Sequence, residues 1–369
     1  MIKNMRKRGL AGFATLGAAA LVLVGCGSAP EAGGDTDAPE TPEAGNSEGV
    51  DFLACAVSDE GSWNDKSFNE VSMRGLLKAK SDLGVSIQDA ESITFEDFTP
   101  NLDAMVAAGC DVTFAVGFNI VEEVNQAALD NPDFNFVSID GWKEDEATPN
   151  LKAMVWEMNE SSFLAGYLSA AYSQSKTIGT YGGMNIPAVT DFMVGFYNGA
   201  KYYEKETGTE ITVIGFDPAN PDDGDYVGGF EDKGKAKSIS EGQIEKGADV
   251  ILPVAGGLFS ATSEAINESG KDIVMLGVDL DVAKNSPQYA DQILTSIEKT
   301  IDVSVFDVIA ASIDGSFSGD PYIGTLENSG TRISPLYDFE DKVDADVMLK
   351  IEELAKMIIA GDLDPTVTP

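Results

Sequence analysis

Residues 59–75 read DEGSWNDKSFNEVSMRG, and this stretch decides how the rest of the chain is interpreted. An apolar run at residues 52–57 precedes it, and Val71, Leu76 and Leu83 follow at a spacing that suits a helix. This order predicts a strand, a polar loop and a helix. In open α/β sheets, ligands bind beyond the carboxyl ends of the strands, so this loop is a candidate binding site.

The predicted loop carries side chains that suit a ligand: a hydrogen-bond acceptor, two amides and two aromatic faces. These candidates are Asp59, Trp63, Asn64, Phe68 and Asn69. The alternative is a solvated turn, in which Asp65 or Ser67 caps the helix and Phe68 packs into the core. Spacing alone leaves both interpretations open.

Apolar runs and helical patterns alternate along the rest of the chain, which predicts parallel sheets flanked by helices. The predicted strands at residues 52–57, 111–116 and 134–139 end in polar or glycine-rich loops. Because such ends meet at one sheet edge, these loops form a single candidate binding edge. Later predicted elements are strands at 248–254, 272–277 and 293–297, short strands at 322–326 and 333–335, and helices at 301–313 and 345–359.

The length of the chain favours two domains over one, because 369 residues with 43% hydrophobic content can bury a large core. We expect two lobes joined by several crossings of the chain. The first lobe is expected to comprise residues 50–156 and 293–325. The second is expected to comprise residues 157–292 and 326–369.

Charge composition excludes several classes of function. The chain has 62 acidic and 24 basic residues, and its formal net charge is −38. Such a field repels nucleic acid and anionic lipid, so no nucleic-acid partner is expected. The sequence contains no histidine, which excludes Ser-His-Asp and Cys-His catalysis and histidine-based zinc sites. We therefore expect no enzyme activity, no metal and no cofactor.

The first residues predict a lipoprotein signal peptide over residues 1–25. Four cations in the first eight residues precede an apolar run at residues 10–24, which is too short for a stable membrane span. The run ends in LVGC at residues 23–26, which resembles the bacterial lipobox. Cys26 is thus expected to carry lipid on the extracytoplasmic face of the cell membrane. The alternative is a plain secretory signal with a chance cysteine.

Residues 26–49 are rich in glycine, proline and acid and have no apolar periodicity, which predicts a disordered acidic tether. Two cysteines remain beyond it. Cys55 lies in the first predicted strand, and Cys110 lies just before the third. Outside the cytoplasm they could form a disulfide between neighbouring strands or remain two buried thiols, and geometry decides between these alternatives.

Residues 59–69, with Gly75 after them, resemble the signature of the basic membrane protein family, bacterial substrate-binding lipoproteins of ABC importers that capture purine nucleosides. The similarity extends from about residue 51 to the C-terminus. The resemblance implies a two-lobed α/β fold like that of type I periplasmic binding proteins, in which each lobe is a parallel sheet flanked by helices. The further matching stretches are residues 108–118, 131–140, 182–199, 226–234, 277–281 and 295–302.

The resemblance also implies how a base is held. Phe68 and Phe230 would clamp a flat base between two aromatic faces, and Asp140 would hold its edge. The residues themselves leave alternatives open. Asp140 could be a turn residue ahead of Gly141, and Phe230 could staple the helix that begins near Asp232.

For the sugar, the resemblance implies three further contacts. Gly256 would offer a backbone contact, Asp279 would accept ribose hydroxyls and Lys299 would donate to the sugar. Val282 stands where the family commonly has glutamine, a departure at the sugar end of the pattern. Alternatively, Lys299 is a surface cation near Glu298.

The combined expectation is a lipid-anchored monomer that captures guanosine, inosine or adenosine by hinge closure and delivers it to an ABC permease. Three alternatives remain. The ligand of the same fold could be a sugar, because aromatic faces and carboxylates also suit pyranoses. The protein could sense nucleosides without transport, or it could be a nucleoside-cleaving enzyme that uses the aspartates.

Overall fold

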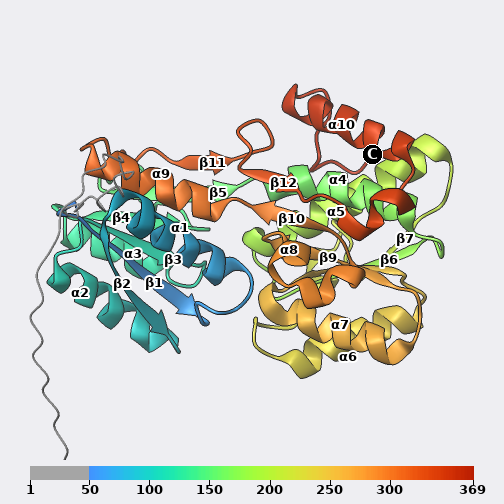
Figure 1. The fold of residues 1–369 in the computed structure, drawn as a ribbon, viewed down its shortest axis with the longest axis horizontal. Helices are drawn as coiled ribbons and strands as arrows, with labels where there is room; N and C mark the ends of the chain where they lie inside the picture. Colours follow the sequence, from blue (N-terminus) through green and yellow to red (C-terminus); the bar gives the residue numbers. More distant parts are fainter. Residues whose placement is uncertain (1–49) are drawn as a thin grey trace, which may run out of the picture. The chain divides into compact units, whose positions relative to one another are not determined.

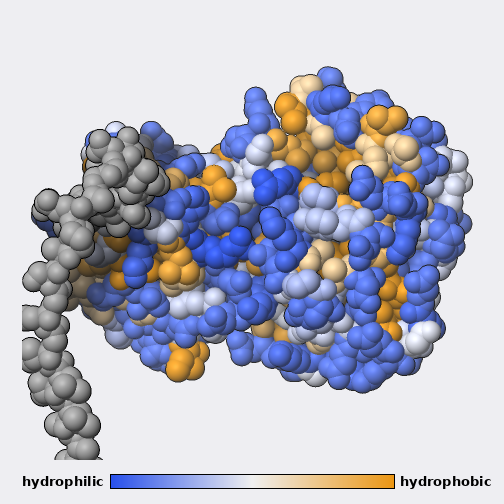
Figure 2. Space-filling model, in the orientation of Figure 1, coloured by the Kyte–Doolittle hydropathy of each residue, from blue (hydrophilic) through white to orange (hydrophobic). Residues whose placement is uncertain are grey.

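The computed structural model describes residues 50–369, which form two lobes, each built on a six-stranded sheet (Figure 1). The predicted signal peptide, tether and lipidated Cys26 lie outside the described residues. Within residues 50–369, no helix is both long enough and apolar enough to cross a membrane. Hydrophilic residues cover most of the face that Figure 2 shows, as the acidic composition requires.

The sheet of the first lobe is entirely parallel, with the strand order β11-β5-β4-β3-β1-β2. Its helices α1 and α9 pack against each other, and α2 packs against α3. Gly75 of α1 allows the first of these contacts, because a Cβ there would lie 2.7 Å from Cβ of Val305. The elements are β1 (Leu53–Glu60), α1 (Phe68–Leu83), β2 (Ser86–Ser92), α2 (Phe98–Ala108), β3 (Val112–Val116), α3 (Val121–Asp130), β4 (Asn135–Ile139), β5 (Leu151–Trp156), α9 (Ile301–Ile313) and β11 (Tyr322–Gly324).

The sheet of the second lobe has the order β12-β10-β9-β8-β6-β7. Helices α4 and α5 approach closely where glycine faces backbone: a Cβ on Gly166 would lie 2.0 Å from the carbonyl oxygen of Phe196. The elements are α4 (Met158–Tyr172), β6 (Thr177–Gly182), α5 (Pro187–Thr207), β7 (Thr212–Ile214), α6 (Lys233–Glu245), β8 (Val250–Val254), α7 (Phe259–Ser269), β9 (Val274–Asp279), α8 (Val282–Asn285), β10 (Ile293–Lys299), β12 (Thr331–Ile333) and α10 (Ala345–Ile359).

The predicted fold class, two lobes with helix-flanked parallel sheets, is confirmed, with one local exception. Strand β12 runs antiparallel to β10, so the second sheet is mixed at this edge. Strand β7 was not predicted. Its three residues are too few to show an alternating or continuous apolar pattern.

The chain passes between the lobes after β5, after β10 and between β11 and β12. This corrects one predicted boundary, because residues 293–299 were expected in the first lobe. Strand β10 instead pairs with β9 and β12 in the second sheet, and only α9 and β11 return to the first lobe. Fully buried strands share the same apolar composition, so their sequence does not identify their partners.

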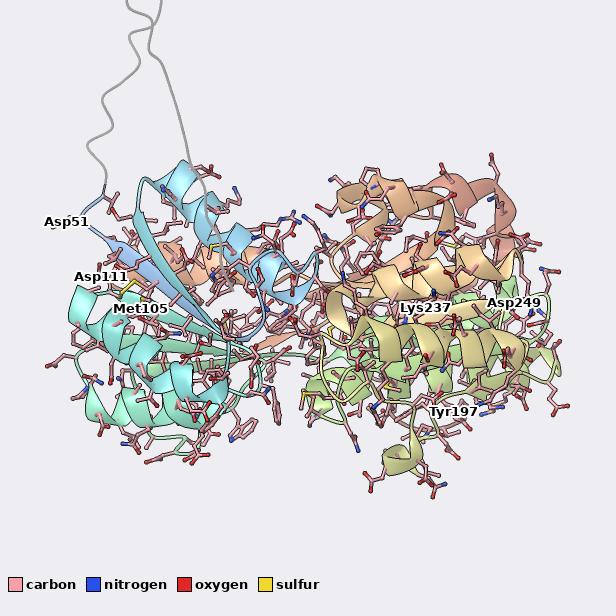
Figure 3. All side chains as sticks on the ribbon, turned by 90° about the horizontal axis from the view of Figure 1, so that it is seen from below. Asp51, Met105, Asp111, Tyr197, Lys237 and Asp249 are labelled. Carbon is pink, nitrogen blue, oxygen red and sulfur yellow. A yellow bond between two sulfur atoms is a disulfide. The ribbon has the colours of Figure 1, made fainter. Side chains whose placement is uncertain are left out.

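Cys55 and Cys110 form a disulfide in the first lobe (Figure 3). Cys55 lies in β1, and Cys110 directly precedes Asp111, whose backbone N–H donates to the carbonyl oxygen of Leu53 at the start of β1. Both cysteines are buried, with 0% and 2% exposure. Pairing of β1 with β3 thus brings together two thiols that are 55 residues apart in sequence.

Candidate functional site

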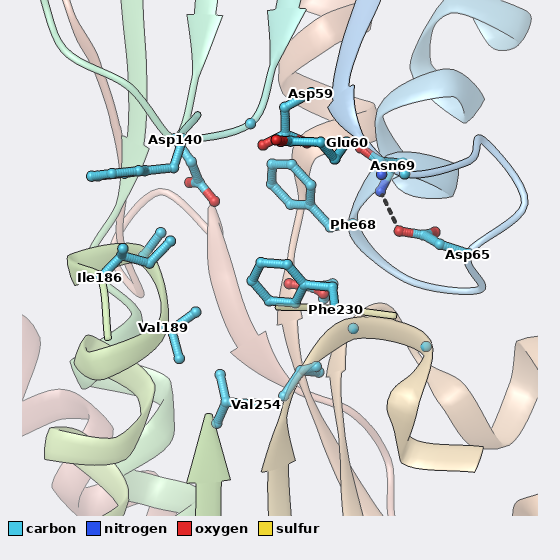
Figure 4. Close-up of a pocket in the computed structure, with 18 of the residues that line it drawn as sticks. Asp59, Glu60, Asp65, Phe68, Asn69, Asp140, Ile186, Val189, Phe230 and Val254 are labelled. Atoms are coloured by element: carbon cyan, nitrogen blue, oxygen red, sulfur yellow. Dashed lines mark hydrogen bonds between the residues drawn. The ribbon is translucent and has the colours of Figure 1, made fainter. Parts of the chain in front are cut away.

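A cavity between the lobes contains most of the predicted ligand contacts (Figure 4). About 800 Å³ of space, part of it open to solvent, is enclosed by loops after β1, β3 and β4 of the first lobe and by α5, the turn after β8 and the ends of β9 and β10 of the second. Its lining combines apolar, aromatic and charged side chains, as small-molecule sites do. The predicted residues that line it are Asp59, Phe68, Asn69, Asp140, Phe230, Gly256, Asp279 and Lys299.

Two predicted residues do not line the cavity. Trp63 is 8% exposed and packs in the core, and its backbone N–H donates to Oε1 of Glu91 at 2.6 Å. Asn64 is exposed. Trp63 is thus buried and Asn64 faces solvent, and the expected contact of these two residues with a ligand stays a prediction.

At the start of α1, the signature loop both caps the helix and contributes a residue to the cavity. The Asp65 carboxylate accepts backbone N–H groups from Ser67 at 2.9 Å, Asn69 at 3.0 Å and Glu70 at 3.1 Å. Asp65 therefore satisfies the free donors of the first helical turn and complements the helix dipole. Phe68, on that turn, lines the cavity. The capping aspartate thus fixes the position of an aromatic ring at the site.

Phe68 and Phe230 point toward each other across the cavity from different lobes (Figure 4). Phe230 lies on the loop before α6 and is 37% exposed. Its ring rests on Gly183, where a Cβ would lie 2.2 Å from the ring carbon Cε1. Gly183, directly after β6, therefore leaves room for the Phe230 ring, which lines the cavity.

Six carboxylates line the cavity, and the most strongly perturbed belongs to Asp59. Burial, with smaller contributions from the carboxylates of Glu60 and Asp140, raises the pKa of Asp59 to about 8. The Asn119 backbone N–H, which donates to Asp59 at 3.4 Å, acts in the opposite direction. Gly117 leaves space for the group, because a Cβ there would lie 2.0 Å from Oδ2 of Asp59. The carboxylates are Asp59, Glu60, Asp65, Asp140, Glu231 and Asp279.

Lys299 is the only cation that lines the cavity among residues 50–369, and it connects the lobes. Its Nζ, at the end of β10, lies 2.7 Å from Oδ2 of Asp140, which follows β4. The side chains are 2% and 9% exposed, so Lys299 is not the surface cation that the alternative interpretation placed near Glu298. Nζ also lies 5.4 Å from the ring centroids of Phe68 and Phe192, within cation–π range.

Two further carboxylates are influenced by Lys299. Burial raises the pKa of Asp279 to about 6, while Lys299 and the Ser67 hydroxyl, which donates to Oδ2 at 2.5 Å, lower it. The pKa of Asp191 is also raised to about 6, by burial and by Glu157, and lowered by Lys299. Asp191 was not predicted, since a lone aspartate in α5 carries no motif that distinguishes it from a solvated residue.

The sequence reasoning also missed the apolar wall of the cavity. Aliphatic side chains from α5 and from the ends of β8 and β9 form it, and their only sequence signal is their position after or at the end of a strand. They are Ile186, Ala188, Val189, Val254 and Val278. A ligand with an apolar part and several polar groups fits a site of this composition.

Replacing Asp59 with asparagine should flatten the dependence of stability on pH. The folded chain holds a proton on Asp59 between about pH 4 and pH 8, where the unfolded chain has lost it. The stability that Asp59 contributes is therefore present at low pH and is lost as the pH rises to about 8. Urea denaturation at pH 5, 6 and 7 gives the free energy of unfolding at each pH. Its slope against pH in Asp59→Asn should differ from that of the unmodified chain by up to about 1.4 kcal/mol per pH unit.

Asp103→Asn is the matched control, because Asp103 is exposed on α2. Its pH slope should equal that of the unmodified chain. The free energy of unfolding of Asp59→Asn should still depend on pH to some extent, because the pKa values of Asp65, Asp191 and Asp279 are raised as well. Identical slopes in all three chains would contradict the prediction.

Comparison with known proteins places this architecture in a family. A family model described as "ABC transporter substrate-binding protein PnrA-like" matches residues 52–323. The ABC transporter nucleoside-binding protein BmpA of Lactococcus lactis is 28% identical over 346 residues, which cover 89% of this chain and 92% of that protein. An uncharacterized lipoprotein of Pyrococcus horikoshii is 29% identical over 292 residues, covering 77% of this chain and 69% of the other.

Solved structures agree on the fold. An ABC transporter solute-binding protein from Aeropyrum pernix superimposes with a TM-score of 0.76 at 24% identity, covering 86% of this chain and 94% of that one. The arabinose-transporter binding protein from a Shewanella species superimposes with a TM-score of 0.56 at 16% identity, covering 84% and 98%. The family match spans most of the two lobes that build the cavity, and this chain belongs to the Bmp family of ABC transporter substrate-binding proteins.

Proposed function

We propose that this protein captures purine nucleosides by closing its lobes over them and delivers them to a membrane permease. The observation that carries this proposal is the pair of aromatic rings, Phe68 and Phe230, that face each other across the cavity from opposite lobes. Stacking of a base on an aromatic side chain contributes about 1–3 kcal/mol in nucleic-acid binders. Contacts from both lobes exist together only in the closed arrangement, so ligand binding favours closure.

The polar groups around the rings suit the rest of a nucleoside. Lys299 can donate to sugar oxygens, and Asp279 can accept two hydroxyl hydrogens. In the proposed complex, Asp59 and Asp140, which both line the cavity, meet the polar edge of the base. Asp59 keeps its proton below about pH 8, but five further carboxylates and one lysine line the cavity. They disfavour a nucleotide, because its phosphate would meet like charge. The name of the Lactococcus relative, a nucleoside-binding protein, supports the same ligand class.

Calorimetry with inosine, guanosine, adenosine and ribose tests the ligand class. We expect heat of binding from at least one nucleoside and a weaker signal from ribose, because ribose lacks the flat ring that stacks. Heat from ribose alone would instead support the sugar-binding alternative. Release of free hypoxanthine from inosine would show the nucleoside-cleaving alternative.

We further propose that Cys26 carries lipid and holds the protein on the extracytoplasmic face of the cell membrane, beside the permease. The Pyrococcus relative is named a lipoprotein, which supports this location. Mass spectrometry of the mature N-terminus tests it. An acylated cysteine at position 26 is expected, and an N-terminus without acyl chains would contradict the proposal. A gene neighbourhood without a permease would favour nucleoside sensing.

Phe68→Ala and Phe230→Ala should each weaken nucleoside binding about tenfold or more, because each variant loses one of the two stacking faces. Titration calorimetry measures the effect. Phe95→Ala is the matched control: Phe95 is 57% exposed in the same lobe as Phe68 and does not line the cavity. Unchanged affinity in both Phe68→Ala and Phe230→Ala would remove the aromatic clamp from the proposal.

A further inference from the structure

The lobes touch at one edge of the cavity, which we call the closing seam: Asp65 and Ser67 of the first lobe and Gly256, Gly257 and Asp279 of the second. The Ser67 hydroxyl donates to Oδ2 of Asp279 at 2.5 Å. A Cβ built on Gly256 would be in ordinary contact with Cβ of Ser67, at 3.9 Å. At the seam, backbone of one lobe therefore faces backbone and short side chains of the other.

Gly257 is the tightest point of the closing seam. A Cβ at this position would lie 2.2 Å from the carbonyl oxygen of Asp65, and contacts under 3.0 Å essentially never occur for real Cβ atoms. Gly257 does not have a positive φ, in contrast to Gly256 with φ 55°. Alanine would therefore fit the backbone of Gly257 itself, and the obstacle is the other lobe.

Neither side of this contact can move away easily. Asp65 is held by the three backbone N–H groups that its carboxylate accepts at the start of α1. Gly257 lies in the short helical turn Gly256–Leu258, and its carbonyl oxygen accepts the Ser260 hydroxyl at 2.9 Å. An added methyl group would thus separate the lobes and leave the turn in place.

We propose that Gly257 is a positioning residue for ligand capture, because only hydrogen at this position lets the lobes meet closely enough to complete the cavity. The proposal rests on the capture mechanism proposed above, and it assigns Gly257 a role through lobe closure, distinct from contact with the ligand. Two other contacts between the lobes depend on the same closure: Ser67 with Asp279, and Lys299 with Asp140.

Gly257→Ala should weaken nucleoside binding about tenfold or more, mainly through faster dissociation, because the closed state loses its contacts across the lobes. Gly257→Val should weaken it further, since the larger side chain forces a wider separation. The unfolding midpoint without added ligand should stay within a few degrees of that of the unmodified chain. When the lobes separate without unfolding, Lys299 and Asp140 both reach water, so no unpaired charge stays buried.

The test uses the full chain, the nucleosides inosine, guanosine and adenosine, and Gly242→Ala as the matched control. Gly242 lies in α6 of the second lobe, and no atom lies within 4 Å of a Cβ built on it. Fluorophores attached through non-canonical residues at the exposed positions 96 and 238, one in each lobe, report the distance between the lobes. Calorimetry reports affinity, and heating reports the unfolding midpoint.

Weaker binding by Gly257→Ala, with a longer distance between the lobes at saturating nucleoside and an unchanged midpoint, would support the proposal, provided that Gly242→Ala behaves like the unmodified chain. Unchanged affinity would overturn it. Weaker binding with the same distance between the lobes would also overturn it, since Gly257 would then act by touching the ligand.

The two proposals fail separately. If the unmodified chain binds none of the three nucleosides, the proposed ligand class falls, and the distance distribution measured without ligand decides the role of Gly257. A smaller closed fraction in Gly257→Ala than in the unmodified chain would still support closure control. Identical distributions would overturn it.

Discussion

Replacing Lys299 with methionine is expected to remove most nucleoside binding and to lower the free energy of unfolding by about 3 kcal/mol or more. Methionine keeps the length of the side chain but leaves Asp140 without the cation that lies 2.7 Å away in a buried site. Lys299 also lowers the pKa values of Asp279 and Asp191, so both would rise further. Calorimetry and urea denaturation measure the two effects.

The loss of stability should depend on pH in a defined direction. Lys299 stabilises the charged forms of the neighbouring carboxylates. Its removal should therefore lower the free energy of unfolding most above the pKa of Asp279, about 6. The loss should become smaller as the pH falls and these carboxylates gain protons. Lys237→Met is the control. Lys237 pairs with Glu264 and Glu268 at the surface, where such pairs contribute about 1 kcal/mol or less.

The double variant Lys299→Met with Asp140→Asn should recover part of the lost stability, because it removes the unpaired charge as well. It should not recover nucleoside binding if both groups contact the ligand as proposed. Equal unfolding free energies for Lys299→Met and the unmodified chain would show that the ion pair between the lobes contributes nothing.

Replacing both Cys55 and Cys110 with alanine should lower the free energy of unfolding of the first lobe by about 4 kcal/mol. The disulfide closes a loop between residues 55 apart, and opening it gives the unfolded chain more conformational freedom. Trp63, Trp142 and Trp156 all lie in the first lobe, so tryptophan fluorescence during urea denaturation follows this lobe selectively.

Two controls accompany the cysteine variant. Cys26→Ser removes a cysteine that lies outside the disulfide and should leave the denaturation curve unchanged. The unmodified chain, denatured in the presence of a reductant, should approach the midpoint of the alanine variant. If the midpoints with and without the disulfide coincide, loop closure does not stabilise this lobe.

Local signals in the sequence predicted most secondary structure, and they failed where a residue's partner is distant. The helices at residues 301–313 and 345–359 have the predicted bounds, because a 3.6-residue apolar period is visible within one segment. Strand β10 was recognised as a strand but assigned to the wrong lobe. Its pairing with β9 depends on a contact between separate segments, which apolar composition does not specify.

The site shows the same division. The positions of Asp59 and Asp140 after the predicted strands at residues 52–57 and 134–139 indicated that they meet at one sheet edge, and both line the cavity. Trp63 and Asn64 follow in the same stretch but do not line the cavity. The backbone N–H of Trp63 donates to Glu91 on a neighbouring segment, and spacing along the sequence does not reveal such a contact.

The sequence by itself determined the order of strands and helices, the acidic character of the chain and the loops from which binding groups come, because these follow from local periodicity and composition. Only the tertiary structure decided that Cys55 bonds to Cys110, that Lys299 pairs with Asp140 and that Gly257 meets the backbone of Asp65. Each of these contacts joins segments far apart in sequence, and their distances are fixed by the packing of whole lobes.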